Sequence, residues 1–172
     1  MVDQQSTILR PQTLVEEFKK NSVTHVITIP DSETNHLYNL MCEQPWLDII
    51  RATREGQTFA IAYGLSIGKK VPVVLIQNAG MFESGDSIRG FLKDMGCPLV
   101  FIVGYKGWAG PGKSKDTNAI YTEPFLKAFQ INYYLVENDA DGPNISKAFE
   151  EARTKNRAVA VLVCDEYHSF NG

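Results

Sequence analysis

The sequence predicts an α/β protein built on one six-stranded parallel sheet with helices on both faces. Short apolar runs of strand length alternate with amphipathic stretches of helix length along the 172 residues, which is the pattern of repeated strand–helix–strand units. The strand runs are rich in Val and Ile, as expected of parallel strands that are covered on both faces. There is no internal repeat and no domain boundary, so we expect residues 1–172 to form a single domain.

The first half of the chain supplies the opening units of this sheet. Pro11 can begin a helix over residues 12–20. The apolar residues on one face of this helix are Leu14, Val15 and Phe18. The elements that follow are a strand over 25–29, a turn over 30–32, a helix over 34–41 and a strand over 47–51.

The stretch over residues 56–68 differs from the other predicted helices because it is apolar on nearly every side. Its apolar residues are Phe59, Ala60, Ile61, Ala62, Tyr63, Leu65 and Ile67. A helix of this kind is expected to be buried on most sides, either in a core or against a partner.

The second half of the chain continues the same alternation. The predicted elements are a strand over 71–76, a turn over 78–80, a helix over 87–95, a strand over 99–103, a helix over 122–129, a strand over 133–136, a helix over 146–155 and a strand over 159–163. A long loop over residues 104–118 follows the strand over 99–103 and precedes the helix over 122–129. Structureless loops of this length are uncommon in compact domains and are usually functional.

Composition and missing motifs exclude several classes of function. The chain carries 17 basic and 20 acidic residues without a long run of either sign, so it offers no electrostatic footprint for nucleic acid or an anionic membrane. No apolar run is long enough to span a membrane and the first residues are polar, so we expect a soluble, cytoplasmic protein. Dinucleotide, phosphate-loop, nucleophile-elbow and metal-ligand motifs are absent from the sequence, and we predict no metal ligand on this chain.

In open parallel α/β sheets, ligands bind at the carboxyl ends of the strands, near the point where the strand order reverses. The predicted strands place four segments at that edge: residues 30–32, 52–56, 77–80 and 104–118. Glu55 draws attention because its carboxylate stands between the end of a strand and the start of the apolar helix. It either stabilises the helix amino terminus, by about 0.3–1 kcal/mol, or is a functional carboxylate whose proton affinity is raised by apolar surroundings.

Four segments resemble one family of enzymes. They are Ile29-Pro30-Asp31-Ser32, Glu55-Gly56, Val73-Val74-Leu75-Ile76-Gln77-Asn78-Ala79-Gly80 and Pro98-Leu99-Val100-Phe101-Ile102-Val103-Gly104. Together they are similar to the alpha subunits of sulfopyruvate decarboxylase and the amino-terminal domain of phosphonopyruvate decarboxylase, which are thiamine-diphosphate enzymes. The resemblance extends over roughly residues 11–163 and implies the thiamine-diphosphate pyrimidine-domain fold.

The resemblance implies a catalytic role for Glu55. In such enzymes a glutamate hydrogen-bonds N1′ of the aminopyrimidine and so favours the 4′-imino tautomer, which removes the proton from C2. The resulting ylide attacks a 2-oxo acid, and carbon dioxide leaves because the cofactor accepts the electron pair. The resemblance also places Gln77, Asn78 and Gly80 on the pyrimidine side of the cofactor, although these residues could equally form a simple turn.

The same resemblance places Asp31 and Ser32 at the mouth of the pocket. Asp31 is then a catalytic proton relay and Ser32 a substrate contact, and we assign His36, just past the turn, to the substrate as well. The alternative is an Asx turn that caps the following helix. The loop after the fourth strand departs from the family, because residues 104–118 contain no histidine, and this leaves the substrate open.

The resemblance further implies a partner. Thiamine diphosphate is held through Mg²⁺, which needs oxygen ligands, and the family supplies them from a Gly-Asp-Gly…Asn element. Gly85-Asp86-Ser87 resembles it only superficially, because it follows a predicted turn rather than a strand. We therefore expect the diphosphate domain and Mg²⁺ on a separate beta subunit, in a heterotetramer of two alpha and two beta subunits or larger.

Three hypotheses follow from the sequence. The first is the alpha subunit of a decarboxylase for a small 2-oxo acid, such as a sulfopyruvate- or phosphonopyruvate-like one. The second is a carboligase or synthase subunit with the same cofactor, which five aromatic residues near the presumed pocket would suit: Phe82, Phe91, Tyr105, Trp108 and Tyr121. The third is a non-catalytic, flavodoxin-like binding module in which Glu55 only caps a helix.

Overall fold

A computed structural model describes residues 8–29 and 35–164, and it confirms the predicted architecture. Six strands form one sheet in the order β2-β1-β3-β4-β6-β5, and every neighbouring pair is parallel. The strands are β1 (His25–Thr28), β2 (Asp48–Arg51), β3 (Pro72–Gln77), β4 (Val100–Gly104), β5 (Asn132–Val136) and β6 (Val159–Val163). Each predicted strand therefore exists, and its ends lie within one residue of the prediction.

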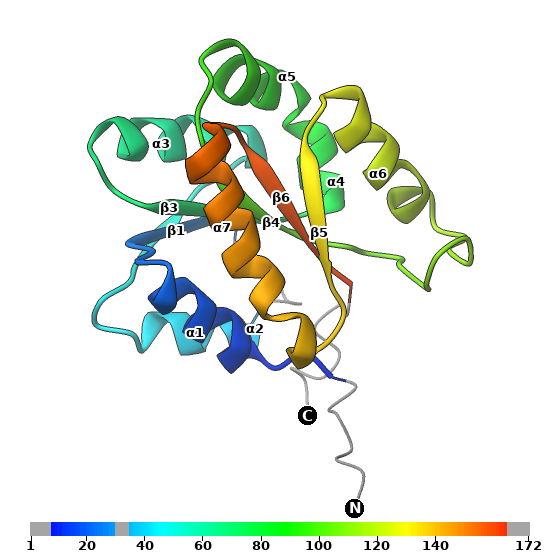
Figure 1. The fold of residues 1–172 in the computed structure, drawn as a ribbon, viewed down its shortest axis with the longest axis horizontal. Helices are drawn as coiled ribbons and strands as arrows, with labels where there is room; N and C mark the ends of the chain where they lie inside the picture. Colours follow the sequence, from blue (N-terminus) through cyan, green and yellow to red (C-terminus); the bar gives the residue numbers. More distant parts are fainter. Residues whose placement is uncertain (1–7, 30–34, 165–172) are drawn as a thin grey trace, which may run out of the picture.

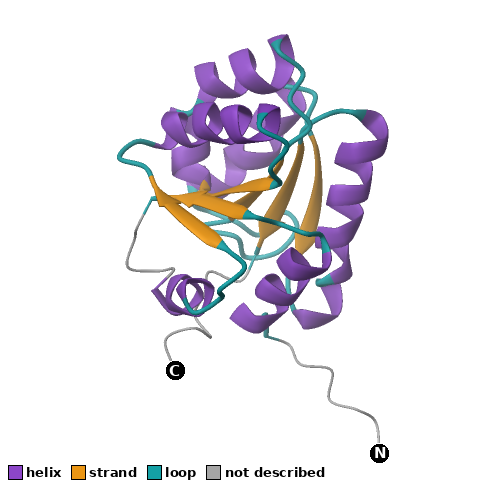
Figure 2. Cartoon of the chain, turned by 90° about the vertical axis from the view of Figure 1, so that its left-hand side faces the viewer, coloured by secondary structure: helices purple, strands orange, loops and turns teal. Residues whose placement is uncertain are grey.

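Helices cover both faces of this sheet (Figures 1 and 2). Their bounds are α1 (Pro11–Lys20), α2 (Asn35–Cys42), α3 (Glu55–Ile67), α4 (Asn78–Glu83), α5 (Gly85–Ser87), α6 (Thr117–Ala128) and α7 (Pro143–Lys155), with a π-helical segment η1 (Ile88–Asp94) and a 3-10 turn η2 (Asp139–Asp141). One hydrophobic core lies between the sheet and α1, α2 and α7. The other lies between the sheet and α3, α4, η1 and α6.

The strand order fixes where a ligand site can lie. From β1 the chain passes outward to the edge strand β2, and from β2 it crosses back over β1 to β3 on the other side. The order therefore reverses between β1 and β3, which pair in parallel register. Because ligands of open parallel sheets bind at such a reversal, the carboxyl ends of β1 and β3 mark the first place to look.

Several helices begin earlier than the sequence predicted, and α4 and α6 matter most for the site. Residues 78–80, predicted as a turn, open helix α4 directly after β3, and the Oδ1 atom of Asn78 accepts a hydrogen bond from the Ala79 N–H at 3.0 Å. Helix α6 begins at Thr117 rather than at residue 122, because Asp116 caps it by accepting from the Asn118 N–H at 2.8 Å. The long loop is therefore shorter than predicted.

Helix α3 is less buried within this chain than the sequence predicted. Within this chain it is not buried on most sides: its buried residues are Thr58, Phe59 and Ala62. Ile67 is 66% exposed, and a Cβ added at Gly64 would meet no atom within 4 Å. The expectation that the chain's own core buries this helix on most sides is therefore wrong. Burial of its exposed side against a partner stays a prediction.

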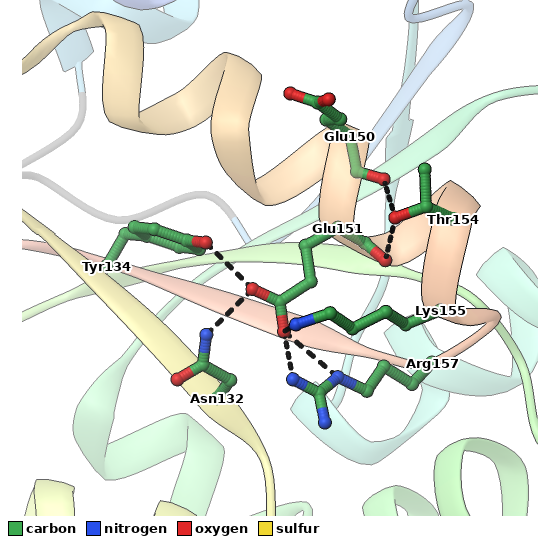
Figure 3. Close-up of polar contacts among 7 residues, drawn as sticks. All are labelled: Asn132, Tyr134, Glu150, Glu151, Thr154, Lys155 and Arg157. Carbon is green, nitrogen blue, oxygen red and sulfur yellow. Dashed lines mark hydrogen bonds and ion pairs between the residues drawn. The ribbon is translucent and has the colours of Figure 1, made fainter.

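A buried carboxylate joins α7 to the opposite, amino-terminal edge of the sheet (Figure 3). Glu151 accepts hydrogen bonds from the Tyr134 hydroxyl at 2.7 Å and the Asn132 amide at 2.8 Å, and it pairs with the Arg157 guanidinium. Its side chain is 6% exposed. Burial alone would raise the pKa of Glu151, but the hydrogen bonds from Arg157, Tyr134 and Asn132 outweigh it and lower the pKa to about 2.

This network predicts a pH-dependent contribution to stability. The folded-state pKa of Glu151 lies below its unfolded value of 4.5, so the stabilisation is complete above about pH 5 and is lost as the pH falls towards 2. We expect Glu151→Gln to lower the free energy of unfolding by about 1–3 kcal/mol at pH 7.

Urea denaturation at a series of pH values measures this effect. The difference between the wild type and Glu151→Gln should shrink steadily from pH 5 to pH 3. The neighbouring Glu150 is exposed, so Glu150→Gln is the matched control and should change the unfolding free energy little. A stability difference for Glu151→Gln that stays constant over this pH range would contradict the assignment.

Candidate functional site

A small cavity lies at the strand-order reversal between β1 and β3. It has a volume of about 140 Å³. Its walls are formed by Ile29, Glu55, Ile76, Gln77, Ala79 and Gly80. Most pockets that hold an entire small ligand measure about 300–1,000 Å³. This cavity therefore fits one ring of a larger molecule rather than the whole of it.

The fold brings Glu55 to this cavity from the edge strand. Strand β2 ends at Arg51, and a short turn leads into α3, whose first residue is Glu55. Helix α3 packs against β1 and β3, so its amino end crosses from the edge of the sheet towards the reversal. The Thr58 hydroxyl donates to the Glu55 carbonyl at 2.6 Å and closes the first turn. The half-buried Glu55 side chain is the acidic group in the cavity wall.

Gly80 lets helix α4 approach the Glu55 side chain. A Cβ atom at residue 80 would lie 2.4 Å from Glu55 Cγ and 3.0 Å from Glu55 Oε1. Real Cβ atoms do not come this close to other carbons, so any side chain at this position would displace Glu55. Glycine at residue 80 is therefore required for close approach to Glu55.

Asn78 lies next to the cavity but its amide is used inside the protein. The side chain is fully buried. Its amide nitrogen donates to the Lys106 carbonyl at 3.0 Å and to the Thr122 hydroxyl at 3.2 Å. Asn78 thus ties the end of β3 to the segment after β4 and to α6. Its position supports the cavity wall rather than forming it.

The structure brings together three of the residues singled out in the sequence, namely Glu55, Gln77 and Gly80. His36 lies in the first turn of α2 with an exposed side chain, outside the cavity lining. Asp31 and Ser32 lie outside the described residues. The segment that contains them follows β1, one of the two strands that flank the cavity.

Sequence reasoning missed the apolar walls of the cavity. Ile29 follows β1 and Ile76 lies near the end of β3, so both were visible as the last apolar residues of predicted strands. It also missed Glu83, whose carboxylate accepts a hydrogen bond from the Gly56 N–H at 3.0 Å. Nothing in the local sequence signals that contact, because it joins residues 27 positions apart.

The five aromatic residues of the second hypothesis do not gather at this cavity. Phe82 and Tyr121 line a separate, more open cavity of about 590 Å³ between α4 and α6. Tyr105 and Trp108 stack on each other with ring centroids 4.7 Å apart. Phe91 packs against Tyr63, with the ring centroids 5.6 Å apart. None of the five lines the cavity beside Glu55.

The described residues offer neither a metal-binding cluster nor a membrane-spanning helix. In that part of the chain, no group of three or more His, Cys, Asp and Glu side chains is placed to hold a metal ion. Asp86, from the segment that resembles a magnesium motif, pairs instead with Arg89 at 2.8 Å. No helix among the described residues has both the length and the apolar character needed to cross a membrane.

The fold and the site define a class: a parallel α/β domain with a glutamate in an apolar-walled cavity where the strand order reverses. Comparison with known proteins shows which proteins of this class the chain is similar to. Three curated relatives are alpha subunits of sulfopyruvate decarboxylase. The protein from Methanocaldococcus jannaschii is 27% identical over 89 residues, which is 52% of this chain and 53% of the relative.

The other two relatives match over a longer part of the chain. The protein from Methanothermobacter thermautotrophicus is 20% identical over 87% of this chain and 92% of its own length. The one from Methanococcus maripaludis is 22% identical over 83% of this chain and 87% of its own. No family model matches the sequence.

Among solved structures, benzoylformate decarboxylase from Polynucleobacter necessarius superposes with a TM-score of 0.69. The match covers 95% of this chain and 31% of that chain at 18% sequence identity. This similarity shows a shared fold. The relatives and the shared fold together confirm the resemblance to the sulfopyruvate decarboxylase alpha subunits that the sequence predicted.

The contact between Gly80 and Glu55 can be tested by adding one methyl group. We expect Gly80→Ala to move the Glu55 side chain out of the cavity and to lower the free energy of unfolding by about 1–2 kcal/mol, because the new Cβ overlaps Glu55 Cγ. A crystal structure of the variant and urea denaturation measure the two effects.

Gly64 provides the matched control for this substitution. It also lies within a helix, but a Cβ there would meet no atom within 4 Å. Gly64→Ala should therefore raise the unfolding free energy by up to about 1 kcal/mol through helix propensity. If Gly80→Ala were equally stabilising and left Glu55 in place, the close contact would not constrain the site.

Proposed function

We propose that this chain is the pyrimidine-binding alpha subunit of a thiamine-diphosphate-dependent decarboxylase that acts on a small 2-oxo acid of the sulfopyruvate type. The placement of Glu55 in an apolar-walled cavity at the strand-order reversal is the observation that carries the proposal. The decarboxylase subunits found among the curated relatives support the enzyme class.

The residues of the cavity fit the aminopyrimidine end of this cofactor. Ile29 and Ile76 offer apolar surface for the faces of a flat ring. The Glu55 carboxylate and the Gln77 amide offer hydrogen-bonding groups for its polar edge. The volume of about 140 Å³ suits a single ring. When bound, thiamine diphosphate supplies the electron sink that decarboxylation of a 2-oxo acid requires.

The role of Glu55 in this proposal is to hold and move one proton at the ring nitrogen N1′. A carboxyl group can share that proton only if its own affinity for it is comparable with that of the ring nitrogen. Ile29 and Ile76 stand with Glu55 in the cavity wall, so a ring bound there would meet apolar side chains as well as the carboxyl group. Gly80 leaves the room that the side chain needs.

The structure weakens the alternative in which Glu55 serves as a helix cap. The residue before α3 makes no side-chain capping bond, and the Gly56 N–H at its first turn donates to Glu83 instead. Glu83, rather than Glu55, therefore caps the first turn of α3. This observation favours a chemical role for Glu55 over the non-catalytic binding module.

Residues near the end of β1 complete the proposed site. We assign Asp31 to proton relay and Ser32 and His36 to substrate contact, because they follow the strand that flanks the cavity. Asn78 keeps its assignment to the pyrimidine side of the site through its support of the β3–α4 junction.

The proposal includes a beta subunit that holds the diphosphate and Mg²⁺, in a heterotetramer or larger assembly. The small size of the cavity supports this division, because the rest of the cofactor must be held elsewhere. The exposed side of α3, which includes Gly64 and Ile67, is apolar enough to contribute to the contact between subunits. The free thiols of Cys42, Cys97 and Cys164 suit the reducing environment of the cytoplasm.

One observation favours carboligation as a second candidate. Helix α4 contributes Gly80 to the small cavity and Phe82 to the larger apolar one of about 590 Å³. In this second candidate, the larger cavity takes a bulkier acceptor substrate. Product analysis with and without an added aldehyde separates the two activities, because only a carboligase consumes the aldehyde.

The proposal is tested by co-expressing the chain with a candidate beta subunit and following decarboxylation of a panel of 2-oxo acids with Mg²⁺ and thiamine diphosphate. We expect Glu55→Gln to lower turnover by at least about a hundredfold, because the amide cannot exchange a proton with the ring. Sulfopyruvate should be the preferred substrate.

Two controls make this experiment decisive. Glu43→Gln changes an exposed glutamate outside the cavity and should leave turnover unchanged. Gel filtration should show that Glu55→Gln still assembles with the beta subunit. Full turnover by an assembled Glu55→Gln enzyme would refute the proposed role of Glu55.

A further inference from the structure

Glu83, the last residue of α4, reaches across to the amino end of α3. Its Oε2 atom accepts a hydrogen bond from the Gly56 N–H at 3.0 Å, and its Oε1 atom is paired with the Nε atom of Arg54. The two bonded groups are thus the residues immediately before and after Glu55. The Glu83 side chain is 31% exposed, whereas that of Arg54 is 71% exposed.

This contact replaces a cap that α3 lacks. The first N–H groups of a helix have no partner within the helix and are usually satisfied by the residue at the N-cap position. Here that residue is Arg54, which makes no side-chain capping bond. The hydrogen bond from Arg54 is the largest cause that lowers the pKa of Glu83, and the Gly56 N–H contributes in the same direction. Glu83 is therefore a charged acceptor when it caps α3.

Helix α4 contacts the beginning of α3 at two points. Gly80 and Glu83 are three residues apart and so share one face of α4. Gly80 meets the side chain of Glu55, while Glu83 binds the backbone of the next residue. A third contact comes from α5, because a Cβ added at Gly56 would lie 2.9 Å from the Ser87 hydroxyl. Helices α4 and α5 thus pack closely around the backbone next to Glu55.

Arg54 is held by the same carboxylate. Glu83 pairs with the Arg54 guanidinium and accepts from the Gly56 N–H. The two residues that flank Glu55 in the chain are therefore bound to one side chain.

We propose that Glu83 is a positioning residue for Glu55: it caps α3, fixes the backbone from which the Glu55 side chain extends, and holds the Arg54 guanidinium. The effect on Glu55 is a property of this chain alone. Its consequence for catalysis rests on the function proposed above.

The other charged groups on elements that pack against α3 are already paired or distant. On α5 and η1, Asp86 and Asp94 both bind Arg89, and Lys93 is exposed. Strand β3 carries no charged residue. His25 of β1 lies at the amino-terminal end of its strand. Among the described residues, Arg54 and Glu83 are thus the charges bound to the first turn of α3.

The direct test follows the Glu55 side-chain carboxyl carbon by NMR in the full-length chain labelled with ¹³C-glutamate, with Glu55→Gln identifying the resonance. Glu83→Gln keeps an oxygen for the Gly56 N–H but removes the charge and releases Arg54. We expect it to shift and broaden the Glu55 carboxyl resonance, because the backbone from which the side chain extends is held less firmly, and to speed hydrogen exchange of the Gly56 amide by about tenfold. Arg54→Gln leaves the hydrogen bond between Gly56 and Glu83 in place and should change that exchange rate little.

Two further variants separate positioning from general stability. Asp86→Asn removes an exposed negative charge of the neighbouring helix α5 and should leave the Glu55 resonance and the Gly56 exchange rate unchanged. Glu83→Asp keeps a charged acceptor and should restore part of the wild-type protection of the Gly56 amide. In the assembled enzyme, Glu83→Gln should lower kcat about tenfold with KM little changed.

The outcomes are distinguishable. A Glu83→Gln chain that is folded, as shown by its thermal unfolding, and that leaves the Glu55 chemical shift and the Gly56 exchange rate unaltered would overturn the positioning role. A changed Glu55 resonance with faster Gly56 exchange supports it, even if no beta subunit yields activity. In that case the proposed function fails while the coupling between Glu83 and Glu55 stands.

Discussion

The approach of helix α4 to the Glu55 side chain is the constraint on which the rest of the site depends. It requires a residue without a side chain at position 80, since a Cβ there would lie 2.4 Å from Glu55 Cγ. It also requires α4 to start directly at the end of β3, where buried Asn78 ties the junction to α6 and to the segment after β4. That contact between two helices brings Glu55 and Gly80 together in the cavity wall, while the strand ends supply the apolar residues Ile29 and Ile76.

Two glutamates at opposite edges of the sheet have different surroundings. At the amino-terminal edge, Glu151 is buried and fully engaged by Arg157, Tyr134 and Asn132, so its proton affinity is low and its charge is permanent at neutral pH. At the carboxyl edge, Glu55 is half-buried beside a cavity with apolar walls. A carboxylate surrounded by donors holds a structure together, whereas one that faces an apolar cavity is available to a ligand.

The sequence predicted the sheet well because buried parallel strands are continuous apolar runs, as in Val159–Val163, where prediction and structure agree at both ends. It also predicted the position of Glu55 between the end of an edge strand and the start of an apolar helix. Helix α4 was missed because six residues that include a glycine carry too little periodicity to distinguish a helix from a turn. The capping of α3 by Glu83 joins residues far apart in the chain, so it cannot be predicted from local sequence propensities.

The central claim is that Glu55 promotes removal of a proton from the cofactor, and it can be measured without any substrate. The assembled complex, loaded with thiamine diphosphate and Mg²⁺, is transferred to deuterium oxide, quenched at increasing times, and the loss of the C2 proton signal is followed by NMR. The account predicts rapid exchange in the wild type and exchange slower by at least about a hundredfold in Glu55→Gln, at equal cofactor occupancy. Equal exchange rates in the two complexes would contradict it.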